Sequence, residues 1–139
     1  MDPAEALPTT SSPPVRRILI VDGDATAALV TQRGLQARLG AAADVQVAPS
    51  PGAAWLRCVR GHVDLLIVDP HPRNRTPSSL LKAVRAERPD IAVLVLTAYD
   101  TPRLRAEIRA LGMQHYFAKP VELVHLERGV RLALGLDKD

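Results

Sequence analysis

The chain has 139 residues, enough for one domain with a complete hydrophobic core, and 47% of them are apolar, which argues against wholesale disorder. The net charge of +3 is too small to indicate nucleic-acid binding, and no segment is apolar for the length of a membrane span. A single cysteine, Cys58, cannot form an internal disulfide, which fits a cytoplasmic protein. Residues 1–15 are rich in Pro, Ser and Thr and predict a disordered tail.

Short apolar runs alternate with amphipathic segments along the rest of the chain. Three helices are expected to begin at a Ser-Pro or Thr-Pro pair, because proline suits the first helical position and the hydroxyl can cap the helix. Gly40 and Gly112 are placed to end two helices. In chain order, the sequence predicts a strand at 16–21, a helix at 25–39, an edge strand around 45–47, a helix from Ser50-Pro51, a strand at 63–69, a helix from Thr76-Pro77 to just before Pro89, a strand at 92–97, a helix from Thr101-Pro102, a strand at 116–118 and a helix at about 121–134.

Five strands alternating with five helices predict a doubly wound parallel sheet with helices on both faces, formed by residues 16–139. The run 63–69 is expected to be a central strand, because apolar residues fill it on both faces. In an open parallel sheet, ligands bind at the carboxyl ends of the strands. The polar residues that end four of the strands should therefore converge on one pocket; they are Asp22, Asp69, Thr97 and Lys119.

Four short motifs, taken in this order, resemble the receiver domain of two-component response regulators. The resemblance extends from Arg16 to about Leu134 and implies a flavodoxin-like fold with strand order 2-1-3-4-5. None of the motifs is specific alone, and the joint pattern carries the resemblance. The motifs are Ile-Leu-Ile-Val-Asp22, Leu-Leu-Ile-Val-Asp69, Val-Leu-Thr97-Ala98 and Tyr116-Phe-Ala-Lys119-Pro120.

The resemblance implies a phosphorylation site. Asp69 would be the phosphoacceptor, and Thr97 and Lys119 would assist the transfer. Mg²⁺ would be held by the carboxylates of Asp22 and Asp69 and by the backbone carbonyl of His71. Phosphoryl transfer depends mostly on positioning and charge neutralisation, which suits this set of groups.

The resemblance also implies a switch and partners. Thr97 and Tyr116 would form the switch, and Pro120 would follow a cis peptide bond. A histidine kinase or a phosphotransfer protein would supply the phosphoryl group to a stand-alone receiver. A downstream protein or a second copy of the chain would dock on the face formed by the fourth helix, the last strand and the last helix. Five arginines lie on these two helices and predict an acidic partner surface; they are Arg103, Arg105, Arg109, Arg128 and Arg131. The alternative is that they only solvate the helices and that Tyr116 is a fixed core residue.

Two departures from the family pattern bear on the metal. Gly23 stands where the family has a second acid, so Mg²⁺ is expected to bind weakly. Asp24 follows it and is either a metal ligand or the N-cap of the first helix, with capping favoured because it needs only local turn geometry. Prolines stand one and three residues after Asp69, at Pro70 and Pro72, which is expected to displace the following carbonyl.

Two alternative functions follow from these residues. The first is a degenerate receiver that binds proteins without phosphorylation, which Gly23 favours. The second is a phosphatase, because Asp22-Gly23-Asp24-Ala25-Thr26 is similar to the nucleophile motif of haloacid-dehalogenase-type enzymes. In that alternative Asp22 and Asp24 would be catalytic. It ranks last, because the further acids that such enzymes need are not found on a strand after Lys119.

Overall fold

The computed structural model describes residues 14–70 and 76–136, which form five strands, five α-helices and one short 3-10 helix. The expected tail, 1–15, therefore lies almost wholly outside the described residues. The strands are β1 (Arg16–Asp22), β2 (Ala43–Val47), β3 (Leu65–Asp69), β4 (Ala92–Thr97) and β5 (His115–Ala118). The helices are α2 (Ala25–Leu39), η2 (Gly40–Ala42), α3 (Pro51–Arg60), α4 (Thr76–Glu87), α5 (Pro102–Ala110) and α6 (Leu123–Ala133).

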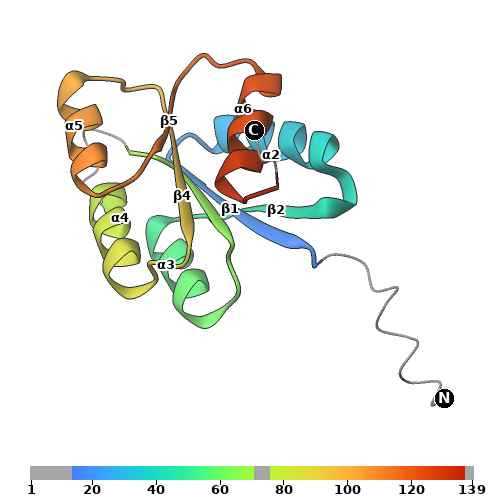
Figure 1. The fold of residues 1–139 in the computed structure, drawn as a ribbon, viewed down its shortest axis with the longest axis horizontal. Coiled ribbons are helices and arrows are strands. Elements are labelled where there is room, and N and C mark those ends of the chain that lie inside the picture. The colour runs from blue at the N-terminus through green and yellow to red at the C-terminus, as the bar shows by residue number, and fades with distance from the viewer. Residues whose placement is uncertain (1–13, 71–75, 137–139) are drawn as a thin grey trace.

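All strand pairs are parallel, and the sheet order is β2-β1-β3-β4-β5 (Figure 1). This confirms the predicted flavodoxin-like fold class, including the strand order. β3 is central and buried along its whole length, as its apolar sequence predicts. Because every strand runs in the same direction, the residues that end the strands lie at one edge of the sheet.

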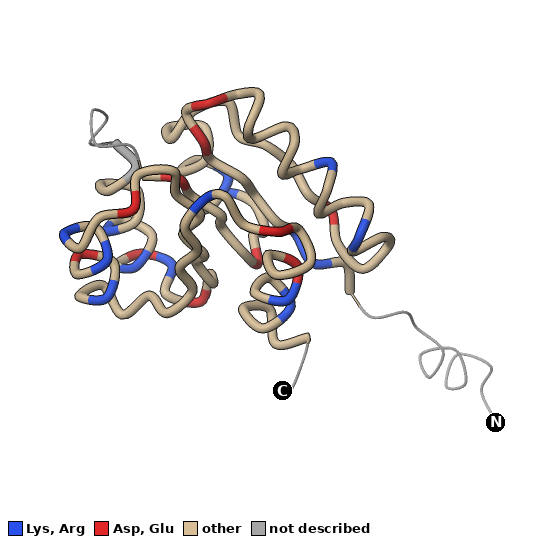
Figure 2. The backbone as a smooth tube through the Cα atoms, turned by 90° about the horizontal axis from the view of Figure 1, so that it is seen from above, with Lys and Arg blue, Asp and Glu red and all other residues tan. Residues whose placement is uncertain are grey.

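The surface carries charges of both signs. Figure 2 shows Lys and Arg positions spread over the fold instead of forming one continuous basic stripe. Within the part of the chain that the structure describes, no helix combines the length and the apolarity that a membrane crossing needs.

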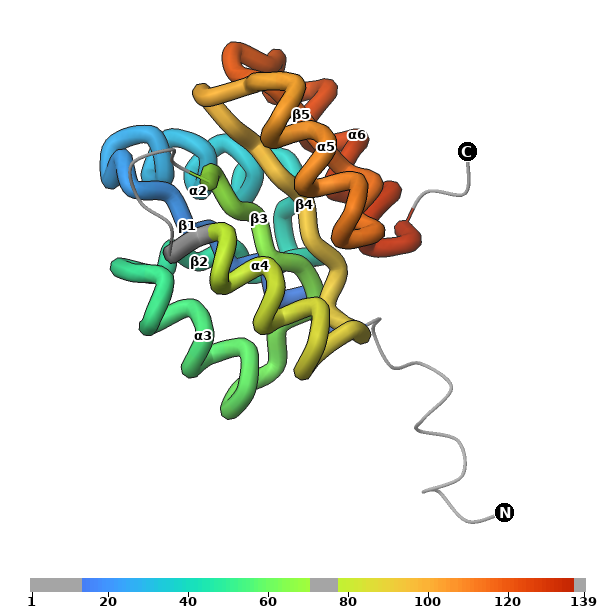
Figure 3. The backbone as a smooth tube through the Cα atoms, turned by 90° about the vertical axis from the view of Figure 1, so that its left-hand side faces the viewer, coloured from blue at the N-terminus to red at the C-terminus, as the bar shows by residue number. Residues whose placement is uncertain are grey.

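Successive strand residues point to opposite faces of the sheet and so build two separate cores. Leu19 and Val21 of β1 belong to the cluster beneath α3, α4 and α5, hereafter the α3–α5 core. Ile18 and Ile20 belong to the cluster beneath α2 and α6, hereafter the α2–α6 core. Figures 1 and 3 show the three helices of the first group side by side on one face and the other two on the opposite face.

The helix starts follow the predicted capping signals. Ser50 Oγ accepts the Ala53 N–H at 3.1 Å before α3, and Thr101 Oγ1 accepts the Leu104 N–H at 3.1 Å before α5. Gly40 ends α2 with a φ of 57°, a conformation that favours glycine.

The last helix begins two residues later than the sequence predicts. Val121 and Glu122 come before α6, and the Glu122 carbonyl accepts its first hydrogen bonds, from the N–H groups of His125 and Leu126. Val121 packs, partly buried, against the α2–α6 core. Its apolar side chain therefore continues the core without being helical, which is why the apolar pattern alone placed the boundary too early.

Candidate functional site

Asp22 and Asp69 are neighbours across the sheet, because they are register partners at the ends of β1 and β3. The Asp22 carboxylate is oriented by its own turn, since its Oδ1 accepts the Asp24 N–H at 2.8 Å. Asp69 is buried, with 6% of its surface exposed. The fold thus places two carboxylates side by side where little water reaches them.

Lys119 connects the two carboxylates. Its Nζ lies 2.7 Å from Asp22 Oδ2 and 3.0 Å from Asp69 Oδ2. The backbone positions it, because the Lys119 N–H donates to the Thr97 carbonyl at 2.7 Å and extends the pairing of β5 with β4. The peptide bond to Pro120 is cis, as the resemblance implies.

The charge of Lys119 is stabilised by these contacts. Burial lowers the pKa of the ammonium group, but the hydrogen bonds to Asp22 and Asp69 outweigh that effect, and the pKa is raised overall above its ordinary value. The residue is therefore a fixed positive charge at the edge of the sheet at any physiological pH.

The two oxygens of Asp69 differ in their environment. Oδ2 accepts hydrogen bonds from Lys119 and, at 3.3 Å, from the Ala98 N–H. Oδ1 is buried and has no hydrogen-bond partner among the described residues. An unpaired buried carboxylate oxygen is costly, so it marks a position where a cation or another donor is expected.

The carboxylates suit Mg²⁺, which proteins usually hold by one or two carboxylates plus water molecules. Asp22 and Asp69 supply two, and in the described ranges no set of three His, Cys, Asp or Glu side chains is arranged to hold a metal. Asp24 is turned away, because its Oδ1 accepts the N–H groups of Thr26 and Ala27 and caps α2. Capping, the favoured prediction, is confirmed. The expected ligand carbonyl of His71 and the proline Pro72 lie outside the described residues.

Thr97 ends β4 and is completely buried. Its Oγ1 accepts the Tyr99 N–H at 2.9 Å, so the hydroxyl oxygen is held by the loop that follows the strand. The hydroxyl hydrogen is free to donate in another direction. The structure therefore brings together the four strand-end residues that the sequence singled out.

Tyr116 belongs to a separate network on the α5 side. Its hydroxyl donates to Asp100 Oδ1 at 2.8 Å, and its ring lies under the Arg105 guanidinium at 4.8 Å. The Arg105 guanidinium also donates hydrogen bonds to both carboxylate oxygens of Asp100, at 2.7 and 2.8 Å. Burial first, and then the hydrogen bond to Asp100, raise the pKa of Tyr116 to about 12.

Sequence reasoning missed Asp100. It follows Tyr99 in a loop and has no motif around it, and the contact with Arg105 spans five positions, which no helical spacing predicts. Its position just before the Thr101-Pro102 helix start was the available signal, since an acidic side chain placed there can interact with the first turn of the helix that follows.

The sequence profile of the response regulator receiver domain matches residues 18–131. The chain therefore belongs to the response regulator receiver domain family. The phosphatase alternative is not supported, because this match covers most of the chain and because the Asp24 carboxylate is occupied in capping α2.

Curated relatives are longer regulators. The transcriptional regulatory protein ZraR of Escherichia coli K12 is 31% identical over 119 residues, which cover 85% of this chain and 26% of that protein. The DNA-binding transcriptional regulator NtrC of Rhizobium meliloti is 28% identical over 109 residues, which cover 78% of this chain and 22% of that protein. The chain thus spans about a quarter of the length of these relatives.

Solved structures share the fold. A response regulator receiver protein from Pseudomonas putida superposes with a TM-score of 0.77 at 22% identity, covering 87% of this chain and 99% of that one. The response regulator TrrA from Thermotoga maritima, solved in complex with Mg²⁺ and BeF, superposes with a TM-score of 0.74 at 22% identity, covering 86% and 100%.

Proposed function

We propose that this receiver domain accepts a phosphoryl group on Asp69 and signals the change through protein contacts. The observation that carries the proposal is the position of Lys119, whose ammonium group contacts both Asp69 and Asp22 at a buried strand end. A buried carboxylate beside a fixed positive charge is suited to attack phosphorus and to have the resulting phosphoryl charge neutralised.

The proposed transfer is a displacement at phosphorus. A carboxylate oxygen of Asp69 forms the new bond to phosphorus, while the bond from phosphorus to the donor breaks and the donor keeps the electron pair. Lys119 remains protonated and neutralises charge on the phosphoryl oxygens, because its raised pKa preserves the ammonium. We assign the donor to a histidine kinase or a phosphotransfer protein.

Mg²⁺, when bound, neutralises further charge on the phosphoryl group. We assign its protein ligands to Asp22 and Asp69, with the partnerless Asp69 Oδ1 as the oxygen that most needs a cation. Binding is expected to be weak because Gly23 contributes no carboxylate. The space around Gly23 is open, because a Cβ added there would meet no atom within 4 Å, and its φ is not positive, so an aspartate fits at this position.

The proposed readout runs through Thr97 and Tyr116. The Thr97 hydroxyl would turn to donate to a phosphoryl oxygen, and Tyr116 would leave its bond to Asp100. The face of α5, β5 and α6 would then change shape. Arg103 and Arg109 are exposed on α5 and Arg128 on α6, whereas Arg105 and Arg131 are paired within the chain, so the first three are available to an acidic partner.

A second candidate function is a constitutive binding module. It is favoured by Gly23, which leaves two carboxylates for the metal among the described side chains. In that case Lys119 would be a permanent structural bridge, and the α5–β5–α6 face would bind its partner without any switch.

Intact-mass measurement tests the phosphorylation. After incubation with Mg²⁺ and a small phosphodonor, the wild type should gain one phosphoryl group and Asp69→Asn none. A wild type that gains nothing would favour the constitutive module. A label retained in Asp69→Asn but lost in Asp22→Asn would contradict the assignment of Asp69.

NMR with a beryllofluoride phosphate mimic tests the switch separately. We expect shifts around Asp69 and also in residues 102–131. Shifts limited to the loops near Asp69 would disprove the coupling to the α5–β5–α6 face while leaving the phosphorylation itself intact.

A further inference from the structure

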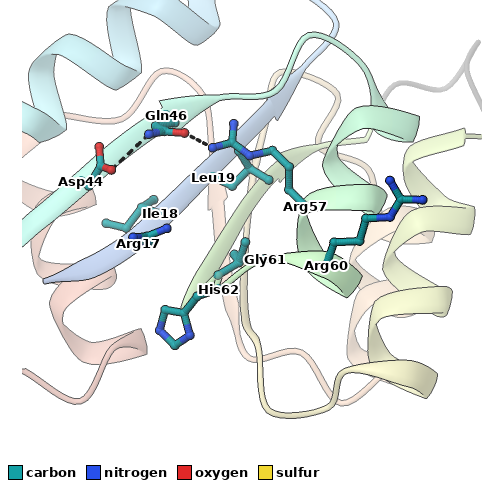
Figure 4. Close-up of a pocket in the computed structure, with 10 residues that line it drawn as sticks. Arg17, Ile18, Leu19, Asp44, Gln46, Arg57, Arg60, Gly61 and His62 are labelled. Carbon is teal, nitrogen blue, oxygen red and sulfur yellow. Dashed lines mark hydrogen bonds between the residues drawn. The ribbon is translucent and has the colours of Figure 1, made fainter. Parts of the chain in front are cut away.

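A cavity lies at the amino-terminal ends of the strands, whereas Asp22 and Asp69 lie at their carboxyl ends. It is bounded by the end of α3 and the amino-terminal halves of β1 and β2 (Figure 4). Its volume is about 240 Å³, and the apolar side chains that line it are Leu19 and Val63, which belong to the α3–α5 core. It exists because β2 is an edge strand whose α3-facing residues are polar, so no apolar side chains fill the corner beneath the helix.

The charge around this cavity is mainly positive. The positive charge comes from three arginines, Arg17, Arg57 and Arg60, and Asp44 is the one acid among the lining residues. His62 also lines the cavity, and its Nε2 lies 3.0 Å from Asp64 Oδ1. The guanidinium groups of Arg17 and Arg60 make no contact with the described residues that would neutralise them. The cavity therefore holds more positive charge than its own acid can balance.

Arg57 is held across the cavity in a fixed direction. Its guanidinium donates to Gln46 Oε1, and Gln46 Nε2 donates in turn to Asp44 Oδ2 at 3.1 Å (Figure 4). This uses one N–H of Arg57 and leaves the others to a ligand. Arg60 points away from Gln46 in Figure 4, so we assign it no contact.

We propose that this cavity binds a small phosphorylated molecule. Arg17 and Arg57 would donate to the phosphoryl oxygens, because guanidinium groups match phosphate geometry, and the apolar lining would receive the body of the ligand. The cavity is smaller than the roughly 300–1,000 Å³ typical of drug-sized ligands, which limits the ligand to a small one.

The preference for basic residues at the end of a helix does not explain all the arginines that line the cavity. Arg57 and Arg60 lie in the last turn of α3, where basic residues complement the helix dipole. Arg17 comes from β1, and on that strand it lies on the same face as Leu19, toward α3. Arg17 faces Asp44, its register partner on β2, so one acid lies beside it, and an anion in the cavity would engage Arg17 together with Arg57.

The inference is independent of phosphorylation at Asp69. The cavity is built from the amino-terminal part of β1, whereas Asp22 ends the same strand. Ligand binding should therefore proceed unchanged in Asp69→Asn.

An NMR titration of the full chain with adenosine monophosphate, and in parallel with inorganic phosphate, tests the proposal. We expect shifts in the amides of residues 17–19, 44–46 and 57–63, with the nucleotide binding more tightly than phosphate because it also uses the apolar lining. Arg17→Gln and Arg57→Gln should each weaken nucleotide binding about tenfold. Asp44→Asn should strengthen it.

Arg33→Gln is the matched control, because Arg33 is exposed on α2, which covers the opposite face of the sheet from α3. It should leave the affinity unchanged. Equal affinities of Arg17→Gln and Arg33→Gln would overturn the proposal. So would shifts centred on Lys119, which would place the anion at the opposite edge, or shifts spread evenly over all the exposed arginines, which would indicate charge screening alone.

Discussion

Phe117 of β5 packs directly against Gly129 of α6. A Cβ at position 129 would lie 2.4 Å from Phe117 Cζ and 2.5 Å from Cε1, closer than carbon atoms approach one another. Gly129 is buried in the middle of a helix, where glycine is otherwise unfavourable. Close packing of the helix on the strand therefore explains its presence.

This contact predicts the effect of Gly129→Ala. The added methyl group must displace the ring, so the free energy of unfolding should fall by about 1–3 kcal/mol in urea denaturation. Gly52→Ala in α3 is the control, because the nearest atom to its Cβ position is Ser50 Oγ at 3.9 Å. It should be neutral or stabilising. Equal losses in both variants would contradict the packing explanation.

Removal of Lys119 should destabilise the fold and make it sensitive to metal. In Lys119→Met, Asp22 and Asp69 lose their shared cation, and we expect the free energy of unfolding at neutral pH to fall by about 2 kcal/mol. Added Mg²⁺ should restore part of the loss. Lys82→Met, at an exposed position of α4, is the control and should change little.

The pH dependence of that difference has a definite sign. The pKa of Lys119 is raised in the folded state, so its contribution is complete below the ordinary lysine pKa of about 10.4 and is lost as the pH rises through the folded value. The gap in stability between wild type and Lys119→Met should therefore stay constant from neutral pH to about pH 10. A stability difference that shrinks already near neutral pH would contradict a stabilising ion pair between Lys119 and the two carboxylates.

Substitutions at Asp24 separate capping from metal binding. Asp24→Ala should lower the free energy of unfolding by about 1 kcal/mol, because the cap of α2 is lost, whereas Asp24→Asn preserves a capping oxygen. Mg²⁺ titration should give the same affinity for Asp24→Asn as for the wild type and a higher affinity for Gly23→Asp. A large loss of Mg²⁺ affinity in Asp24→Asn would make Asp24 a ligand.

The ionisation of Tyr116 reports on its bond to Asp100. In a Tyr99→Phe background, an absorbance titration should show the Tyr116 phenol ionising near its pKa of about 12. Asp100→Ala should lower that pKa toward the ordinary value of about 10, because both the acceptor and its negative charge are removed. Since the folded pKa is the higher one, stability from this group is lost as the pH rises from about 10 through 12. An unchanged titration in Asp100→Ala would argue that burial alone sets the pKa.

The sequence predicts the positions of Asp22, Asp69, Thr97 and Lys119 because each ends an apolar run, and parallel strands bring such ends together. Side-chain direction is harder to predict. The Tyr116 hydroxyl is turned toward Asp100 by a loop conformation and by Arg105, and neither leaves a periodic signal in the sequence. The sequence also does not predict that Asp69 Oδ1 lacks a hydrogen-bond partner among the described residues, because this depends on which donors reach one oxygen of a buried carboxylate.

The sheet separates the two cores, and no buried residue among those that the structure describes belongs to both clusters. Leu35 of α2 and Val84 of α4 are completely buried on opposite sides of it. Losses of unfolding free energy from Leu35→Ala and Val84→Ala should therefore add in the double variant, since distant sites without shared partners behave independently. The two layers of helices can thus accumulate substitutions separately, so that the α3–α5 side can diverge while the packing of the α2–α6 side stays as it is.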